Sequence, residues 1–301
     1  MAQYSRNAIL PAANMYELTT WAACAGIMVE PNLLHHIFLQ PFRPPDMAAV
    51  SSSRPWQFKS IFITGGNRGI GLEIVKQLLS LPSPPESIFA TCRSLESASE
   101  LNSLSEGNNH LHVIQLDVND FEGFKQVVSE VERKLEGRGL DLLLNNAGIM
   151  DRSTLDEVTA ERMINVYKTN TVAPLMLAKA FRLLLRRAAL QRSKEDVAKS
   201  FIVNMSSGAG SIANNTRSTM YPYRPSKAAL NMITKSLSID LESDRIVTVA
   251  LHPGWVKTDM GGQNAAVTTK ESVEGLLTVI GSLDDSKNGG FFDFTGKALP
   301  W

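Results

Sequence analysis

The feature that most restricts how this 301-residue chain can fold is a glycine-rich turn at residues 64–71. It follows an apolar run at residues 58–64, which is typical of a strand buried in a parallel sheet. Apolar side chains at helical spacing then occupy residues 70–81, up to a proline-rich stretch. A glycine turn alone is weak evidence, but between a strand and a helix it favours a dinucleotide site, because the backbone and the helix N-terminus can bind a pyrophosphate. The residues expected to bind are Gly65, Asn67, Arg68, Gly69, Ile70 and Gly71.

The rest of the chain continues this alternation of strand and helix patterns. Further strands are expected at residues 87–92, 111–116, 140–144, 201–205, 246–251 and 290–294. Helices are expected at residues 121–135, 159–187, 226–241 and 270–280, the second of them interrupted near Pro174. Strands separated by helices imply right-handed crossovers. The sequence therefore predicts an α/β fold with a doubly wound parallel sheet.

The end of the second expected strand indicates which dinucleotide would bind. A site for NAD commonly has an acidic residue there for the ribose hydroxyls, whereas this chain has Arg93. Arg68 in the glycine turn supplies a second guanidinium, and two such groups suit a 2′-phosphate through charge-assisted hydrogen bonds. Each arginine alone could be an ordinary surface charge. Together they favour NADP(H) over NAD(H).

A tyrosine and a lysine four residues apart, Tyr223 and Lys227, share one face of an expected helix. Tyr221 has Pro225 at the same offset, so Tyr223 is the better candidate for an acid–base group. A nearby ammonium favours the phenolate, and we therefore expect Lys227 to lower the pKa of Tyr223 from its usual value of about 10. The alternative is a surface tyrosine and lysine that share a face by chance.

Five motifs in this order resemble those of the short-chain dehydrogenase/reductase family. They are the glycine turn, the sequence Asn145-Asn146-Ala147-Gly148, the sequence Asn204-Met205-Ser206-Ser207, the Tyr223 and Lys227 pair, and the sequence Pro253-Gly254-Trp255-Val256-Lys257-Thr258. The resemblance covers residues 58–301 and is strongest toward sniffer-type carbonyl reductases and C-factor-like proteins. It implies a single Rossmann domain over these residues, with seven parallel strands in the order 3-2-1-4-5-6-7 and helices on both faces.

The same resemblance implies a role for individual residues. The implied catalytic residues are Ser207, Tyr223, Lys227 and Asn170. Beyond the glycine turn, the implied cofactor contacts are Arg93, Asp117, Val118, Asn146, Ala147, Gly148, Tyr223, Lys227, Pro253, Gly254, Val256 and Thr258. Ser206 remains an alternative to Ser207, because adjacent strand residues face opposite ways. Asn170 could instead be an ordinary polar residue in a helix, and Asp117 a cap on the following helix.

These roles imply reduction of a small aldehyde, ketone or quinone by NADPH, with Tyr223 donating the proton. Substrate specificity is expected in residues 208–220 and 255–267, where Trp255, Met260 and Val267 could form a wall. One alternative is a module that senses NADP(H) without turnover. Another is an isomerase or dehydratase that uses the cofactor transiently. A homodimer is compatible with the resemblance.

Composition and the first 57 residues bear on location and partners. The formal net charge of zero gives no indication of a nucleic-acid or membrane partner. Cys24, Cys92 and the five histidines form no metal-ligand pattern, and the cysteine usage fits a reducing compartment. Residues 1–57 are expected to be a disordered or loosely docked extension, with Met47 as an alternative start. A cytoplasmic location is favoured, and mitochondrial targeting by the extension is the alternative.

Overall fold

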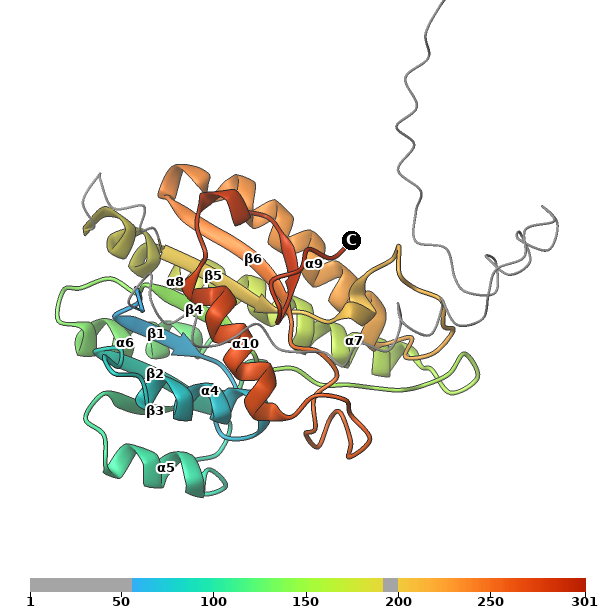
Figure 1. The fold of residues 1–301 in the computed structure, drawn as a ribbon, viewed down its shortest axis with the longest axis horizontal. Coiled ribbons are helices and arrows are strands. Elements are labelled where there is room, and N and C mark those ends of the chain that lie inside the picture. Colours follow the sequence, from blue (N-terminus) through green and yellow to red (C-terminus); the bar gives the residue numbers. More distant parts are fainter. Residues whose placement is uncertain (1–55, 192–199) are drawn as a thin grey trace, which may run out of the picture. The chain divides into compact units, whose positions relative to one another are not determined.

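The computed structural model describes residues 56–191 and 200–301, and its elements carry the labels of Figure 1. The expectations for residues 1–55 lie outside these ranges. At the start of the described chain, the ring of Trp56 packs edge-on against Phe58 with centroids 5.2 Å apart. The side-chain amide of Gln57 donates to the carbonyl of Gly281 at 3.2 Å. Residues 56 and 57 thus pack on the domain that was expected from residue 58 onward.

Seven parallel strands form one sheet in the order β3-β2-β1-β4-β5-β6-β7 (Figure 1). The strands are β1 (Ser60–Ile63), β2 (Ser87–Cys92), β3 (Leu111–Gln115), β4 (Leu142–Asn145), β5 (Ser200–Met205), β6 (Ile246–His252) and β7 (Phe291–Asp293). The order reverses direction between β1 and β4, and such a switch point opens a crevice at the carboxyl ends of the strands. The predicted fold class and strand order are confirmed.

Helices cover both faces of this sheet (Figure 1). On one face lie α4 (Gly69–Leu79), α5 (Ser99–Glu106) and α10 (Thr269–Gly281). On the other lie α6 (Phe124–Leu135), α8 (Ala173–Gln191) and α9 (Tyr223–Asp240). None of the helices within the described ranges is both long and apolar enough to cross a membrane.

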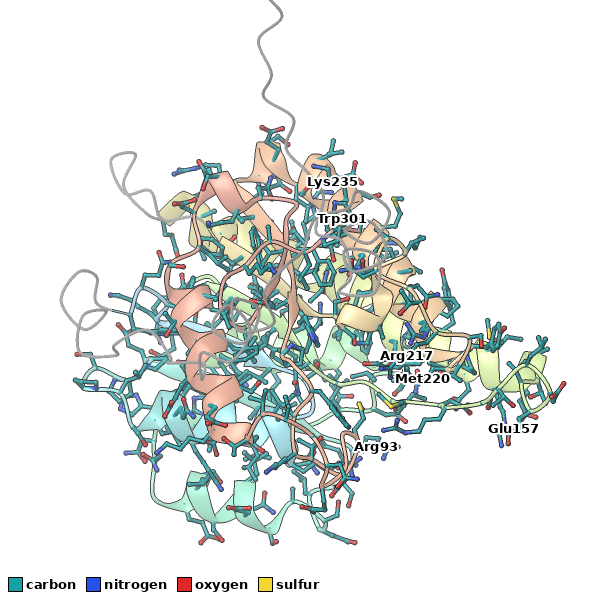
Figure 2. All side chains as sticks on the ribbon, turned by 45° about the vertical axis from the view of Figure 1, so that its right-hand side comes forward. Arg93, Glu157, Arg217, Met220, Lys235 and Trp301 are labelled. Atoms are coloured by element: carbon teal, nitrogen blue, oxygen red, sulfur yellow. The ribbon has the colours of Figure 1, made fainter. Side chains whose placement is uncertain are left out.

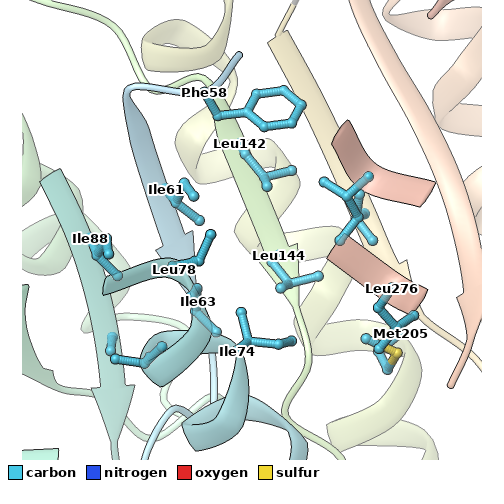
Figure 3. Close-up of a cluster of buried hydrophobic side chains, with 14 of the residues drawn as sticks. Phe58, Ile61, Ile63, Ile74, Leu78, Ile88, Leu142, Leu144, Met205 and Leu276 are labelled. Carbon is cyan, nitrogen blue, oxygen red and sulfur yellow. The ribbon is translucent and has the colours of Figure 1, made fainter. Parts of the chain in front are cut away.

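The central strand β1 shows why the inner strands of the sheet are mostly apolar. All four of its residues are buried, because successive side chains enter the cores on opposite faces of the sheet. Ile61 and Ile63 join the core under α4 and α10, which Figure 3 shows together with Ile74 of α4. Phe62 points the other way and meets Phe181 of α8, with ring centroids 4.4 Å apart.

Two helical features differ from the sequence prediction. Helix α5 was not expected, because its sequence is polar and Leu101 is its one buried residue. The helix expected at residues 159–187 runs as α7 (Ala160–Tyr167), a π-helical turn (Lys168–Val172) and α8. Pro174 has no N–H to donate to the carbonyl of Asn170, four residues earlier, so the α-helical pattern must change there. The interruption therefore falls just before the proline and has Asn170 at its centre.

Candidate active site

The glycine turn between β1 and α4 forms a cradle in which side chains do not fit. Gly65 and Gly69 have φ angles of 68° and 54°, which glycine adopts without strain. A Cβ on Gly71 would lie 2.1 Å from the carbonyl oxygen of Gly65. No acidic residue occupies the first turn of α4, so its free N–H groups and positive dipole end can face an anion. These features fit the pyrophosphate of a dinucleotide.

Asn146, from the turn after β4, supports this cradle from below. Its side-chain amide donates to the carbonyls of Thr64 and Gly65 at 2.9 and 3.2 Å. In return, the hydroxyl oxygen of Thr64 accepts the backbone N–H groups of Asn146 and Ala147, both at 2.9 Å. Asn146 therefore holds the glycine turn in place, besides lying where a cofactor would pass.

Both arginines expected at the 2′-phosphate line the same cavity. Arg93 is exposed beside the end of β2 (Figure 2). Arg68 forms an ion pair with Asp259, with Nη1 and Oδ2 3.1 Å apart, but the two side chains are 68% and 83% exposed. An ion pair as exposed as this contributes at most about 1 kcal/mol. A phosphate dianion can therefore compete with Asp259 for Arg68.

At the end of β3, Asp117 and Val118 also line the cavity. The carboxylate of Asp117 accepts the backbone N–H of Asn119 at 2.9 Å and so shapes the turn itself. Helix α6 begins after Gly123, which makes the alternative of Asp117 as a helix cap wrong. The cofactor role remains compatible with its place at the strand end.

The two adjacent serines after β5 have different partners, which separates their roles. Ser206 is buried, and its hydroxyl donates to the side-chain oxygen of Asn231 at 2.6 Å. Ser207 is half-buried and shares a side-chain hydrogen bond with Tyr223, while its Oγ accepts the N–H of Ala209 at 3.1 Å. Although the cavity wall includes Ser206, its hydroxyl is occupied, so Ser207 is the serine placed to act with Tyr223.

Tyr223 is the first residue of α9, three residues earlier than the expected helix start. The side chain is buried, and this burial raises the pKa of Tyr223 above its usual value. The hydrogen bond with Ser207 and the positive charge of Arg152 act in the opposite direction without outweighing burial. The expected lowering of the pKa of Tyr223 by Lys227 is therefore wrong. The ammonium lies 5.8 Å from the ring centroid, and desolvation of the phenolate dominates.

Lys227 lies one helical turn after Tyr223 and is buried with it. Its Nζ donates to the carbonyl oxygen of Met205 at 2.8 Å. Because burial disfavours the charged form, the pKa of Lys227 is lowered to about 8. The side chain remains mostly cationic at pH 7 and faces the cavity beside Gly148.

Asn170 is fully buried in the π-helical turn, next to Gly148 of the cavity wall. Its side-chain oxygen accepts the N–H of Ile149 at 2.9 Å, and its amide donates to the carbonyl of Ile149 at 2.8 Å. The amide also donates to the Ser226 hydroxyl at 3.1 Å. Asn170 therefore joins the turn after β4 to α9, rather than being a helix residue that solvent satisfies.

The segment after β6 closes the cavity on the far side. Pro253 and Thr258 line it, and the Thr258 methyl would be 3.4 Å from a Cβ on Gly69. Gly254 has a φ of 85° and turns the chain, while Val256 is buried and bridges Val267. Gly254 and Val256 thus shape the segment without lining the cavity.

A cavity of about 1510 Å³ joins these groups. Small-molecule sites are usually about 300 to 1,000 Å³, so this one has room for a dinucleotide and a second molecule. The predicted residues in its wall are Gly65, Asn67, Arg68, Gly69, Ile70, Gly71, Arg93, Asp117, Val118, Asn146, Ala147, Gly148, Tyr223, Lys227, Pro253 and Thr258. Ser207 and Asn170 are not in the wall, but they bond to residues around it.

A family model described as short chain dehydrogenase matches residues 59–268. The chain belongs to the short-chain dehydrogenase family. Two solved structures are similar to it over 81% of this chain and 100% of their own. They are carbonyl reductase Sniffer of D. melanogaster, with a TM-score of 0.79 and 44% identity, and the NADPH-bound carbonyl reductase from chicken fatty liver, with 0.77 and 42%. The resemblance inferred from the motifs is confirmed.

Relatives of this short-chain dehydrogenase also appear among curated sequences. C-signal from Myxococcus xanthus is 41% identical over 163 residues, which are 54% of this chain and 93% of that protein. An oxidoreductase from Schizosaccharomyces pombe is 32% identical over 257 residues, which are 79% of this chain and 96% of its own. The chain is thus an oxidoreductase of this family.

Within residues 56–191 and 200–301, no group of three His, Cys, Asp or Glu side chains is placed to hold a metal ion.

The wall of the cavity includes only part of the segments in which substrate specificity was expected. Met260 lines the cavity as expected, but residues 208–220 do not. The backbone N–H of Ala213 donates to the Trp301 carbonyl at 3.0 Å, which ties that segment to the end of the described chain. Trp255 is 55% exposed, and its indole N–H donates to the carbonyl of Gly261. Instead, residues 149–153 form the wall, and their place directly after the Asn-Asn-Ala-Gly turn was the sequence signal available for finding them.

Proposed function

We propose that this short-chain dehydrogenase is a carbonyl reductase that uses NADPH to convert a small aldehyde, ketone or quinone into the alcohol. The observation that carries the proposal is the buried Tyr223 phenol, hydrogen-bonded to Ser207 and followed by the buried ammonium of Lys227, beside a cradle for a dinucleotide. The NADPH-bound carbonyl reductase from chicken fatty liver, 42% identical, supports both the cofactor and the reaction.

The cofactor of the proposed reaction is NADP(H), and the residues present fit it. The glycine cradle suits the pyrophosphate, and Arg68 and Arg93 suit the 2′-phosphate. When bound, the reduced nicotinamide supplies a hydride to the carbonyl carbon. Lys227 faces the part of the cavity beside Tyr223 and can donate to ribose hydroxyls there.

Tyr223 is the proton donor in this proposal. Because burial raises its pKa, the phenol holds its proton at neutral pH and is ready to give it to the oxygen that gains charge. Ser207 donates a hydrogen bond to the same oxygen and stabilises it as it becomes an alkoxide. The Lys227 cation then stabilises the phenolate that Tyr223 leaves behind.

The two neighbouring tyrosines provide a matched test. Tyr223→Phe keeps the ring but removes the donor, which should lower turnover by about 10² to 10⁴ while NADPH still binds. Tyr221 lines a separate hollow with residues 215–219, and its backbone N–H donates to the Ser153 carbonyl. Tyr221→Phe keeps that backbone hydrogen bond and removes only the side-chain hydroxyl. The transition-state stabilisation lost in this variant should therefore be about 1 kcal/mol or less.

Turnover with a panel of carbonyl compounds and NADPH affinity should be measured for both variants. Near-normal turnover in Tyr223→Phe would refute the catalytic assignment. If the wild type bound NADPH but no carbonyl compound in the panel led to NADPH oxidation, the proposed reaction would be wrong. A module that senses NADP(H) without turnover would then be favoured.

A further inference from the structure

Arg152 lies in the wall of the cavity, between two anchored residues. Before it, Asp151 accepts hydrogen bonds from both the backbone and the hydroxyl of Ser153. Arg162 of α7 bonds to Asp151 at 3.2 Å and to the Ser153 hydroxyl at 2.7 Å. The backbone on either side of Arg152 is therefore held firmly, although Arg152 itself belongs to none of these bonds.

The Arg152 side chain reaches from this loop to the segment after β6. Its Nη2 donates to the carbonyl oxygen of Met260 at 2.8 Å, and both residues line the cavity. A guanidinium has five N–H donors in a planar fork, and this hydrogen bond uses one of them. The contact orients the group while leaving other donors free for a molecule in the cavity.

The charges around Arg152 leave its own charge without a carboxylate partner. Hydrogen bonds from the hydroxyl and the backbone N–H of Ser153, and then the nearby Arg162 charge, lower the pKa of Asp151 and keep it ionised. That carboxylate is paired with Arg162. Glu157 accepts from the backbone and hydroxyl of Thr154. In the described part of the chain, no carboxylate forms an ion pair with Arg152.

The Arg152 guanidinium and the Tyr223 phenol belong to residues that line the same cavity. The positive charge of Arg152 acts to lower the pKa of the Tyr223 phenol, although burial outweighs this effect. Apolar side chains that share this wall, Ile149, Met150 and Met260, can contact the body of a substrate. An unpaired fork-shaped cation near the proton donor is thus combined with an apolar wall.

We propose that Arg152 binds a carboxylate on the substrate, so that the preferred substrates are carbonyl compounds that also carry a carboxylate group. This inference rests on the proposed carbonyl reduction. A single guanidinium matches a singly charged carboxylate, which it binds through two parallel hydrogen bonds. A phosphate dianion is usually bound by a cluster of arginines, and the neighbouring Arg162 is already neutralised by Asp151.

The test compares 4-formylbenzoate with its methyl ester, which has the same aldehyde and ring but no charge. The ratio of kcat/KM for the acid to that for the ester should fall by about 10- to 100-fold in Arg152→Gln, because a charge-assisted pair is lost. Arg152→Lys keeps the charge without the fork and should give an intermediate ratio. Arg217→Gln is the control, since it removes an exposed arginine from a separate hollow.

An unchanged ratio in Arg152→Gln would overturn the proposal, and so would an equal fall in Arg217→Gln. A rise in the KM for NADPH with an unchanged ratio would make Arg152 a cofactor contact instead. Calorimetric binding of 4-(hydroxymethyl)benzoate to the protein with NADP⁺ gives a readout without turnover. Tighter binding to the wild type than to Arg152→Gln is expected. Failure of the wild type to reduce any aldehyde, ketone or quinone would refute the reductase proposal, while this binding result would still decide the role of Arg152.

Discussion

Lys227 is a buried cation, so its replacement should change how the stability of the protein depends on pH. Burial lowers its pKa from 10.5 to about 8 in the folded protein. Between these two values the unfolded chain holds a proton that the folded chain has released. Stability therefore rises with pH in this window, because the unfolded state binds more protons.

The size of the effect follows from the shift. One pKa unit corresponds to about 1.4 kcal/mol, so the shift of Lys227 from 10.5 to about 8 amounts to about 3 kcal/mol in full. Most of this change in the free energy of unfolding falls between pH 7 and pH 10. The free energy of unfolding of the wild type should thus rise by about 2 kcal/mol more than that of Lys227→Met over this interval. Titrating groups remote from Lys227 are common to both proteins and cancel in the comparison.

Urea unfolding at several pH values, followed by tryptophan fluorescence or circular dichroism, measures this difference. Lys235→Met is the matched control, because Lys235 lies on the same helix but is exposed (Figure 2). Its curve should run parallel to that of the wild type. If the curve for Lys227→Met were also parallel to that of the wild type, the argument that burying the Lys227 charge destabilises the folded protein would be refuted. Lys227→Met should also bind NADPH more weakly than the wild type. This second measurement reports the role of the ammonium in cofactor binding separately from its effect on stability.

Two further predictions concern the cofactor end of the cavity. Arg93→Asp should weaken NADPH binding more than NADH binding, because it replaces a charge-assisted bond to the 2′-phosphate with repulsion; equal use of both cofactors by the wild type would contradict the assignment. Gly71→Ala should abolish NADPH binding and destabilise the fold by more than about 3 kcal/mol, since its Cβ would lie 2.1 Å from the Gly65 carbonyl oxygen. Gly107→Ala, where no atom lies within 4 Å of the new Cβ, is the control, and thermal unfolding of both variants checks the difference.

Local patterns in the sequence determined the architecture of this protein. The inner strands β1, β2, β4 and β5 are mostly apolar because both of their faces are buried, whereas the edge strands β3 and β7 are only partly buried. Each long helix shows its apolar spacing. The glycine turn could be identified because Gly65 and Gly71 follow one strand and open one helix. The offset of four between Tyr223 and Lys227 likewise predicted that both side chains lie on one face of α9, where both are buried beside the cavity.

Only the tertiary structure decided between residues that are neighbours in the sequence. Ser206 and Ser207 could be separated because Asn231, 25 residues away, occupies the Ser206 hydroxyl. The pKa of Tyr223 moved opposite to the sequence expectation, because the degree of burial depends on everything packed around the ring and not on the offset to Lys227.

The cavity wall around Arg152 was likewise decided by contacts between distant parts of the chain. Arg152 meets the Met260 carbonyl across 108 residues of sequence, and nothing in the residues next to either one predicts that meeting. Helical and strand periodicity report which face of an element is buried, so they predict elements and their order. Which two loops face each other over a cavity depends on the packing of the whole sheet, and that arrangement has no period in the sequence.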